Sequence, residues 1–361
     1  MKFNEYPLST ICSRLTSGKA IKSSQIVPSG KFPVYGGNGI RGFTDSSNFS
    51  GNCAIIGRQG AMCGNVHYFV GDAYMTEHAI VVCGNEFADT RYLYYLLSTL
   101  NLGRLSAQSA QPGLSVKTIS KQIVKIPDIN YQRKISSFLG AFDDKIEVNN
   151  KIINNLENLM TCLFYEKCIK EHSCKTSLSK IANFLNGLAM QKYPPTTEDE
   201  SLPVLKIREL RQTFCDDNSD LCSSKINPQY IVNDGDLIFS WSGSLLVDIW
   251  SGGKCGLNQH LFKVTSKTHP KWFVFLWIKF HIDKFIAIAQ AKATTMGHIK
   301  RNDLDKAEVI HLDNKEIDVL DKIFKPQFDL LISLKIQNKA LAKIRDLLLP
   351  KLLSGEIYLS N

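Results

Sequence analysis

The sequence lacks the long apolar runs that would place it in a membrane. No stretch of its 361 residues approaches the roughly 20 uninterrupted apolar residues of a membrane-spanning helix. Residues 1–6 also lack the apolar core of a signal peptide. Only 21% of the residues are charged and 44% are hydrophobic, which is typical of a folded chain. We therefore expect a cytoplasmic protein with two globular domains and connecting segments.

Paired metal-binding cysteines are also missing. The ten cysteines are scattered along the chain, and none forms a Cys-x-x-Cys pair. Cys168 and Cys174 are separated by five residues, among them His172, which is wider than the paired spacing of a structural zinc site. The sequence predicts reduced thiols and no metal site.

Recognisable catalytic motifs are absent as well. Residues 37–42 match G-x-G-x-x-G, but the turn-like residues 43–48 follow where a dinucleotide site needs a helix. This context favours a tight polar loop whose glycines bring the backbone close to another group, for which DNA is one candidate. Residues 252–255 lack the Ser/Thr and upstream glycine of a phosphate-binding loop. The chain has no Asn/Asp-Pro-Pro-Tyr/Phe tetrapeptide for base methylation and no carboxylate cluster for a nuclease metal. We predict binding without catalysis and no cofactor.

Positive charge is in excess and is unevenly placed. The net charge is +9, and residues 1–125 hold 12 basic and 6 acidic side chains. Residues 171–305 hold 16 basic and 14 acidic side chains, and the remaining segments are nearly neutral. This distribution suits a protein whose globular parts bind a polyanion such as DNA.

The chain contains an internal repeat. Four blocks recur in the same order, with an offset of about 170–188 residues. The matched blocks are LSTI at 8–11 with LSKI at 178–181, GNCAIIG at 51–57 with GDLIFSW at 235–241, TEHAIVV at 76–82 with NQHLFKV at 258–264, and YLYYLL at 92–97 with WFVFLW at 272–277. The repeated His78 and His260 have no matched nucleophile or metal partner. We favour a structural role for them, with donation to DNA as the alternative.

Each half has the same order of expected elements. Short strands punctuated by glycine are followed by an aromatic helix, near 92–102 or 271–289, and then by a polar loop and a long helix. This pattern predicts an α+β fold with two repeated domains. The expected division is 1–130 for the first domain, 131–170 for its helix, 171–312 for the second domain, and 313–361 for the second helix and tail.

The two long helices share a heptad pattern in equal phase. Shifting the first set by 188 residues superposes most of it on the second, including the polar pair Asn149 and Gln337. We predict an antiparallel coiled coil; the alternative is two amphipathic helices that pack only on their own domains. Pro326 is expected to begin or kink the second helix, and Pro350 to end it or kink its last turn. The expected pairing positions are Leu139, Phe142, Ile146, Asn149, Ile153, Leu156, Met160 and Leu163, with Leu320, Ile323, Gln327, Leu330, Leu334, Gln337, Leu341, Ile344 and Leu348.

Helix length suggests a spacing function. Residues 139–163 would span roughly 37 Å at about 1.5 Å per residue. One turn of B-DNA is about 34–36 Å long, the distance over which dimeric proteins place half-sites. The helices would thus hold two unlike domains about one turn apart, and the expected target is a split sequence with an unread spacer.

Polar loops in both halves supply side chains that can recognise bases. Arg suits guanine, Asn or Gln suits adenine, and Ser or Thr is less selective, whereas Lys and Arg also position phosphates. For each position the alternative is a solvated loop residue or turn former. The first-half candidates are Asn38, Arg41, Arg58, Gln59, Gln108, Ser109, Gln111, Ser115 and Lys117. The second-half candidates are Arg208, Ser240, Trp241, Ser242, Lys254, Lys292, Thr294, Thr295, His298, Lys300 and Arg301.

Six segments give the chain a family resemblance over essentially its whole length. They are IPDINYQRKI at 126–135, FDDKIE at 142–147, FSWSGS at 239–244, LNQHLF at 257–262, ATTMGHIK at 293–300 and LLPKLLSGEI at 348–357. Together they resemble the specificity subunits of type I restriction–modification systems.

The resemblance implies that each half is a target-recognition domain for one part of a bipartite, asymmetric site on double-stranded DNA. It also implies that the two helices bind two methyltransferase subunits, which carry S-adenosylmethionine, and that a restriction subunit adds ATP-driven translocation and cleavage. A stand-alone DNA-binding regulator is one alternative, and a fused nuclease or methyltransferase is another.

Overall fold

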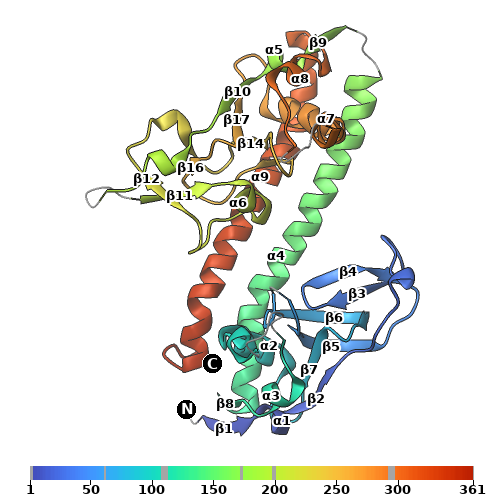
Figure 1. The fold of residues 1–361 in the computed structure, drawn as a ribbon, viewed down its shortest axis with the longest axis vertical. Helices are drawn as coiled ribbons and strands as arrows, with labels where there is room; N and C mark the ends of the chain where they lie inside the picture. The colour runs from blue at the N-terminus through green and yellow to red at the C-terminus, as the bar shows by residue number, and fades with distance from the viewer. Residues whose placement is uncertain are drawn as a thin grey trace. The chain divides into compact units, whose positions relative to one another are not determined.

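The chain forms two compact units that share two long helices. The computed structural model describes residues 3–60, 62–106, 113–170, 174–196, 201–291 and 297–360. One unit contains Met1–Asp144 and Ala342–Asn361, and the other contains Lys145–Leu341. Helices α4 (Ile129–Phe164) and α9 (Asn314–Ser354) contribute residues to both units (Figure 1).

In the described chain, the first unit is built on a six-stranded sheet with the order β2-β7-β5-β6-β3-β4. All neighbours are antiparallel except β3 and β6, which are parallel. The strands are β2 (Cys12–Ser17), β3 (Phe32–Gly36), β4 (Gly39–Thr44), β5 (Phe49–Gly57), β6 (Val66–Met75) and β7 (Ala79–Gly84). Around the sheet lie β1 (Asn4–Pro7) paired with β8 (Ile123–Ile126), and helices α1 (Leu8–Ile11), α2 (Thr90–Thr99) and α3 (Val116–Ser120).

Strand β5 is buried on both faces, because its side chains alternate between two cores. Ala54 and Ile56 belong to the core that contains Leu93 of α2. Cys53 and Ile55 point to the other face and pack in a smaller core. This explains why residues 53–56 form a continuous apolar run rather than an alternating one.

The second unit repeats the central strands of the first. Its four-stranded sheet has the order β10-β17-β14-β15, which corresponds to β2-β7-β5-β6. These strands are β10 (Asn183–Asn186), β14 (Leu237–Ser240), β15 (Val247–Ile249) and β17 (Leu261–Thr265). A second sheet has the order β12-β11-β16-β13, with β11 (Ser201–Leu205), β12 (Leu221–Ser223), β13 (Ile231–Val232) and β16 (Cys255–Leu257). The other elements are β9 (Lys175–Ser177) paired with β18 (Glu308–Ile310), and α5 (Leu178–Ile181), α6 (Ile207–Gln212), α7 (Lys271–Ala291) and α8 (Arg301–Asp305).

The two long helices pair in an antiparallel manner. Within the first unit, Tyr131 of α4 stacks on Tyr358 with ring centroids 4.8 Å apart, and farther along α4 Asp143 forms an ion pair with Arg345 of α9. Within the second unit, Asn149 Nδ2 donates hydrogen bonds of 2.8 Å to both Gln337 Oε1 and Asn338 Oδ1. The predicted α+β fold with a pair of antiparallel helices is therefore confirmed. Asn149 and Gln337, both predicted pairing positions, contact each other.

The predicted register on α9 is partly wrong. Leu330 and Ile344 are 46% and 45% exposed, whereas Phe324, Phe328 and Leu331 are buried. The difference arises because α9 packs on its own domain as well as on α4. Phe324 stacks on Trp272 of α7, and Phe328 contacts Phe275. Leu139, Asn149, Ile153 and Leu334 are buried as predicted, and Phe142, Ile146, Leu156, Leu341 and Leu348 are half-buried.

Pro326 does not begin α9, and Pro350 does not end it. The helix begins at Asn314, after a capping box in which Glu316 N donates to Asp313 Oδ1 and Asp313 N donates to Glu316 Oε2. It ends at Ser354, before Gly355 with φ +78°. Both prolines lie inside the helix.

No helix in the described part of the chain combines the length and apolar character needed to cross a membrane. All ten cysteines are free thiols.

Candidate nucleic-acid interface

In the first unit, three loops meet where β5 ends. Arg58 N donates to His78 O at 2.9 Å, and Leu114 N donates to Arg58 O at 2.8 Å. Gln59 forms an isolated antiparallel bridge with Gly113. We call residues 57–59, 76–78 and 113–114 the first loop junction.

Side chains reinforce this first loop junction. Arg58 donates to Leu114 O through Nε and to Glu77 O through Nη1, both at 3.3 Å. His78 Nε2 lies 3.2 Å from Glu77 Oε1. The Arg58 guanidinium therefore bridges the loop that contains Glu77 and the loop that contains Leu114.

The second unit contains the same arrangement. Trp241 N donates to His260 O at 3.3 Å, and Ile299 N donates to Trp241 O at 3.0 Å. Ser242 forms an isolated antiparallel bridge with His298. Residues 240–242, 258–260 and 298–299 form the second loop junction, which matches the first bond by bond. The match aligns Arg58 with Trp241, so the predicted alignment of residues 51–57 with 235–241 is wrong by one residue.

The equivalence extends to side chains. The Trp241 indole Nε1 donates to Gln259 O at 3.2 Å, as the Arg58 guanidinium donates to Glu77 O. The Gln259 side chain lies 3.4 Å from His260 Nε2, as Glu77 lies beside His78. Both histidines thus occupy the same structural position, at the turn before β7 or β17.

A connection of different length follows each parallel strand beside the junction. Tyr35 O at the end of β3 accepts a bond from Thr76 N, and Leu205 O at the end of β11 accepts one from Asn258 N. In the first unit, two residues, 37–38, then lead into β4. In the second unit, residues 206–220, including α6, lead into β12. The two connections occupy equivalent places in the repeat.

The predicted contact residues of the first unit divide into exposed and engaged groups. Asn38, Arg41, Gln59 and Lys117 are exposed, and the first two belong to the β3–β4 hairpin. Arg58 is bound by the carbonyl groups of its own junction. Ser115 Oγ caps α3 by accepting from Thr118 N. Gln108, Ser109 and Gln111 lie outside the described residues.

Several predicted contacts of the second unit are structural instead. Ser240 is fully buried; its hydroxyl donates to Ser244 O at 2.6 Å and accepts from Leu246 N at 2.9 Å. Ser240 is therefore a structural residue at the end of β14 and not an exposed DNA contact. Ser242 is buried too, and its Oγ lies 2.9 Å from His260 Nδ1.

Arg208 is held by carboxylates. Its Nη2 lies 2.6 Å from Glu209 Oε1 and 2.9 Å from Asp216 Oδ1, and the hydrogen bond from Arg208 lowers the pKa of Asp216. Arg211, one turn later on α6, is exposed. We did not select Arg211 from the sequence, although its i, i+3 spacing from Arg208 is a signal that could have identified it.

The remaining predicted residues lie in or close to the 298–299 segment of the second loop junction. His298 is half-buried, and its ring meets the Trp241 ring edge to face at 6.2 Å. Lys300 is exposed, and its backbone N–H donates to Asp303 at the start of α8. Lys292, Thr294 and Thr295 lie outside the described residues.

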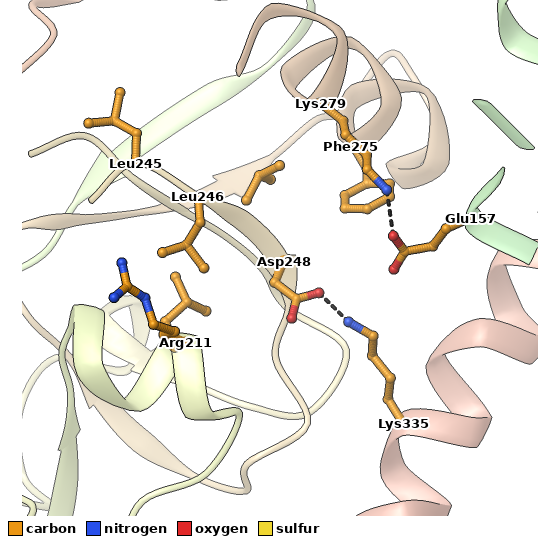
Figure 2. Close-up of a pocket in the computed structure, with 10 residues that line it drawn as sticks. Glu157, Arg211, Leu245, Leu246, Asp248, Phe275, Lys279 and Lys335 are labelled. Carbon is orange, nitrogen blue, oxygen red and sulfur yellow. Dashed lines mark hydrogen bonds and ion pairs between the residues drawn. The ribbon is translucent and has the colours of Figure 1, made fainter. Parts of the chain in front are cut away.

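A cavity of about 320 Å³ in the second unit lies beside β15 and α7 (Figure 2). Lys279 pairs with Glu157, and Lys335 pairs with Asp248. Both carboxylates that line the cavity thus pair with lysines that also line it. The described residues contain no group of three or more His, Cys, Asp or Glu placed to hold a metal ion.

The first unit has a hollow of about 480 Å³ at the equivalent place. It is lined by Val66 and His67 of β6, where the second unit has Val247 and Asp248 of β15. The strand registers establish this match, since Val66 pairs with β5 as Val247 pairs with β14. The hollow is therefore a feature of the repeated fold.

Comparison with known proteins shows which family this chain resembles. Residues 2–158 match the family described as "Type I restriction modification DNA specificity domain". A type I restriction enzyme MjaIX specificity subunit from Methanocaldococcus jannaschii is 24% identical over 306 residues, covering 74% of this chain and 69% of that protein. This chain is thus similar to the type I restriction–modification specificity subunits. The resemblance predicted from the sequence is confirmed.

One further specificity subunit is similar over a shorter segment, and a solved structure is similar over almost the whole chain at low identity. The Escherichia coli type I restriction enzyme EcoprrI specificity subunit is 39% identical over 112 residues, which cover 31% of this chain. This chain spans only 28% of that relative's length. The crystal structure of the type I S subunit from M. genitalium has the same fold, with a TM-score of 0.61, 15% identity, and coverage of 98% of this chain and 96% of that chain.

Proposed function

We propose that this chain is a DNA-specificity subunit that recognises a bipartite, asymmetric site and directs methyltransferase and restriction subunits to it. One observation carries the proposal. The two units have the same loop junction, but the connections that follow β3 and β11 beside it differ. Two related but unlike DNA-binding units on one chain suit a target whose two parts differ. The net charge of +9 favours contact with DNA phosphates.

We further propose that each unit presents an apolar helix surface to one methyltransferase subunit. In the first unit, Phe138, Ile344 and Leu347 are exposed on the long helices. In the second unit, Val148, Leu159 and Leu330 are exposed in the same way. Side chains of this size on a solvent face favour a protein partner. S-adenosylmethionine and ATP would bind to the partner subunits, and the complex would act on DNA in the cytoplasm.

The direct test is a map of methylated bases in the host genome with and without this gene. Deletion is expected to abolish methylation at one asymmetric, two-part motif and to leave other motifs unchanged. Persistence of every methylated motif would contradict the proposal.

Purification distinguishes the remaining alternatives. Co-purification with methyltransferase chains is expected for a specificity subunit and not for a stand-alone regulator. Methyl transfer by the purified chain alone would instead identify an enzyme.

A further inference from the structure

The two loop junctions share their backbone hydrogen bonds but not their neighbouring connections. Arg58 and Trp241 make equivalent main-chain contacts, and so do Leu114 and Ile299. Two units that recognise different half-sites cannot obtain that difference from backbone bonds they have in common. The parts that differ are better placed to determine which bases each unit prefers.

In the first unit, the connection is a tight turn packed on the junction. A Cβ atom at Gly57 would lie 2.2 Å from Gly37 O, and one at Gly37 would lie 3.2 Å from His78 O. The turn is therefore fixed directly beside the junction, and its next residue, Asn38, is exposed.

Arg41 extends the exposed surface of this hairpin. A Cβ atom at Gly36 would lie 2.5 Å from Arg41 Cδ, so the aliphatic stem of Arg41 lies over Gly36. The Arg41 side chain is nevertheless exposed. The stem is thus supported while the guanidinium remains available to a ligand.

In the second unit, the connection is longer and contains α6. A Cβ atom at Gly243 would lie 3.5 Å from Ile207 Cδ1, which places the start of α6 beside the second junction. Arg208 and Arg211 are both exposed, but Arg208 forms ion pairs with Glu209 and Asp216, whereas Arg211 has no ion pair within the described residues and lines the cavity in Figure 2. Arg211 is therefore the better placed of the two arginines to contact DNA.

We propose that these connections are the base-reading elements, with Asn38 and Arg41 as determinants in the first unit and Arg211 in the second. The backbone bonds shared by the two loop junctions position the connections and make no base choice. This inference rests on the proposed function. Arg forms bidentate bonds with guanine O6 and N7, and Asn does so with adenine N6 and N7. The first half-site should thus contain guanine or adenine at the positions read by this hairpin, and the second should contain guanine.

The test uses the complete complex of this chain with its methyltransferase subunits. The complex is incubated with S-adenosylmethionine and a pool of duplexes of random sequence, and the methylated duplexes are sequenced. Arg211→Ala is expected to reduce the preference for one base of the second half-site by about 5- to 150-fold, with no change in the first. Arg41→Ala is expected to produce the converse result, and Asn38→Ala should relax one adenine position in the first half-site.

Matched controls are the exposed Arg104→Ala in the first unit and Lys267→Ala in the second. Neither should alter the motif. The half-site that a variant leaves unchanged also reports that the complex is folded and active.

Two results would overturn the inference in distinguishable ways. If Arg41→Ala and Arg211→Ala lower methylation equally on all sequences, the residues contact phosphates and do not choose bases. If the native complex selects no two-part motif, the proposed function itself fails, and this inference fails with it.

Discussion

The contact between domain and long helix differs in chemistry between the two units. In the first unit, Asp143 of α4 accepts a hydrogen bond from Tyr95 and pairs with Arg345. A shift of 188 residues places Leu331 of α9 at the same point of the repeat, and this leucine is fully buried. At this position of the repeat, a polar network in the first unit is thus replaced by a buried apolar side chain in the second. Elsewhere in the second unit, the ion pairs Lys279–Glu157 and Lys335–Asp248 also join the domain to the long helices.

The first turns of α2 and α7 also differ. Arg91, the second residue of α2, pairs with Asp144 at 2.7 Å. Trp272, the second residue of α7, stacks on Phe324 at 4.3 Å and donates from its indole Nε1 to Asp321 Oδ1 at 2.8 Å. Burial, together with the hydrogen bond to Asp143, raises the pKa of Tyr95, so its hydroxyl stays protonated and remains a donor. The comparison teaches that a repeat can preserve topology while the interactions at equivalent positions change class.

The largest loss of stability is expected when a large buried side chain of the second unit is removed. Trp272→Ala should destabilise the second unit by about 3–5 kcal/mol, because it removes a buried ring and leaves a cavity. Denaturant unfolding followed by hydrogen exchange would assign the loss to residues 145–341. Phe280→Ala, on the exposed side of the same helix, is the control and should change stability little. Equal losses of stability from both variants would show that burial against the long helix does not explain the contribution of Trp272.

A smaller loss is expected from Leu331→Ala, about 3 kcal/mol, for the same physical reason. Its neighbour Leu330 is exposed, so Leu330→Ala should change the free energy of unfolding of the isolated chain by less than about 0.5 kcal/mol. Leu330→Ala should instead weaken co-purification with the methyltransferase. A larger loss of stability from Leu330→Ala than from Leu331→Ala would support the heptad register predicted from the sequence.

In the polar interface, Asp143→Asn should destabilise the first unit by about 2 kcal/mol, since it weakens charge-assisted bonds to Tyr95 and Arg345. Asp144→Asn is the matched control; the carboxylate of Asp144 is more exposed, and its loss should be at most about 1 kcal/mol. Thermal unfolding at low and high salt would measure both. No effect at Asp143 would show that the first interface, too, depends on apolar packing.

The smallest effect concerns acid sensitivity in the second unit. Burial lowers the pKa of His281 below its ordinary 6.5, against the opposing hydrogen bond with Glu308 O. The unfolded chain then binds a proton at a higher pH than the folded chain, so stability is complete above about pH 6.5 and falls as the pH falls below it.

His281→Leu, which replaces the imidazole with an apolar side chain, tests this effect. The variant should lose less stability than the native chain between about pH 7 and pH 5. Unfolding midpoints over that range would measure the difference. An unchanged pH profile would mean that His281 does not contribute to the acid sensitivity.

Much of the fold was predictable because its signals are local. The four matched blocks and the heptad spacing revealed the repeat, the α+β class and the pairing of Asn149 with Gln337. The register of α9 was not predictable in full. The helix carries two apolar stripes, one with Leu330 and one with Leu331, and only the packing of Phe324 and Phe328 on α7 shows which of them is buried.

The site was less predictable than the fold. Asn38 and Arg41 were selected because Arg and Asn suit bases, and both are exposed. Ser240 was selected by the same chemistry but is buried at the end of a strand. Residue type indicates what a side chain can bind, whereas exposure depends on neighbours that are distant in sequence.

The amino-acid sequence alone determined that this chain has two repeated domains and two long helices, because periodicity and repetition are properties of the order of residues. Only the tertiary structure decided that Arg58 and Trp241 hold equivalent loop junctions, and that Arg208 forms ion pairs with Glu209 and Asp216 while Arg211 lines a cavity. Those outcomes depend on hydrogen bonds and packing between segments far apart in the chain, and no local pattern specifies them.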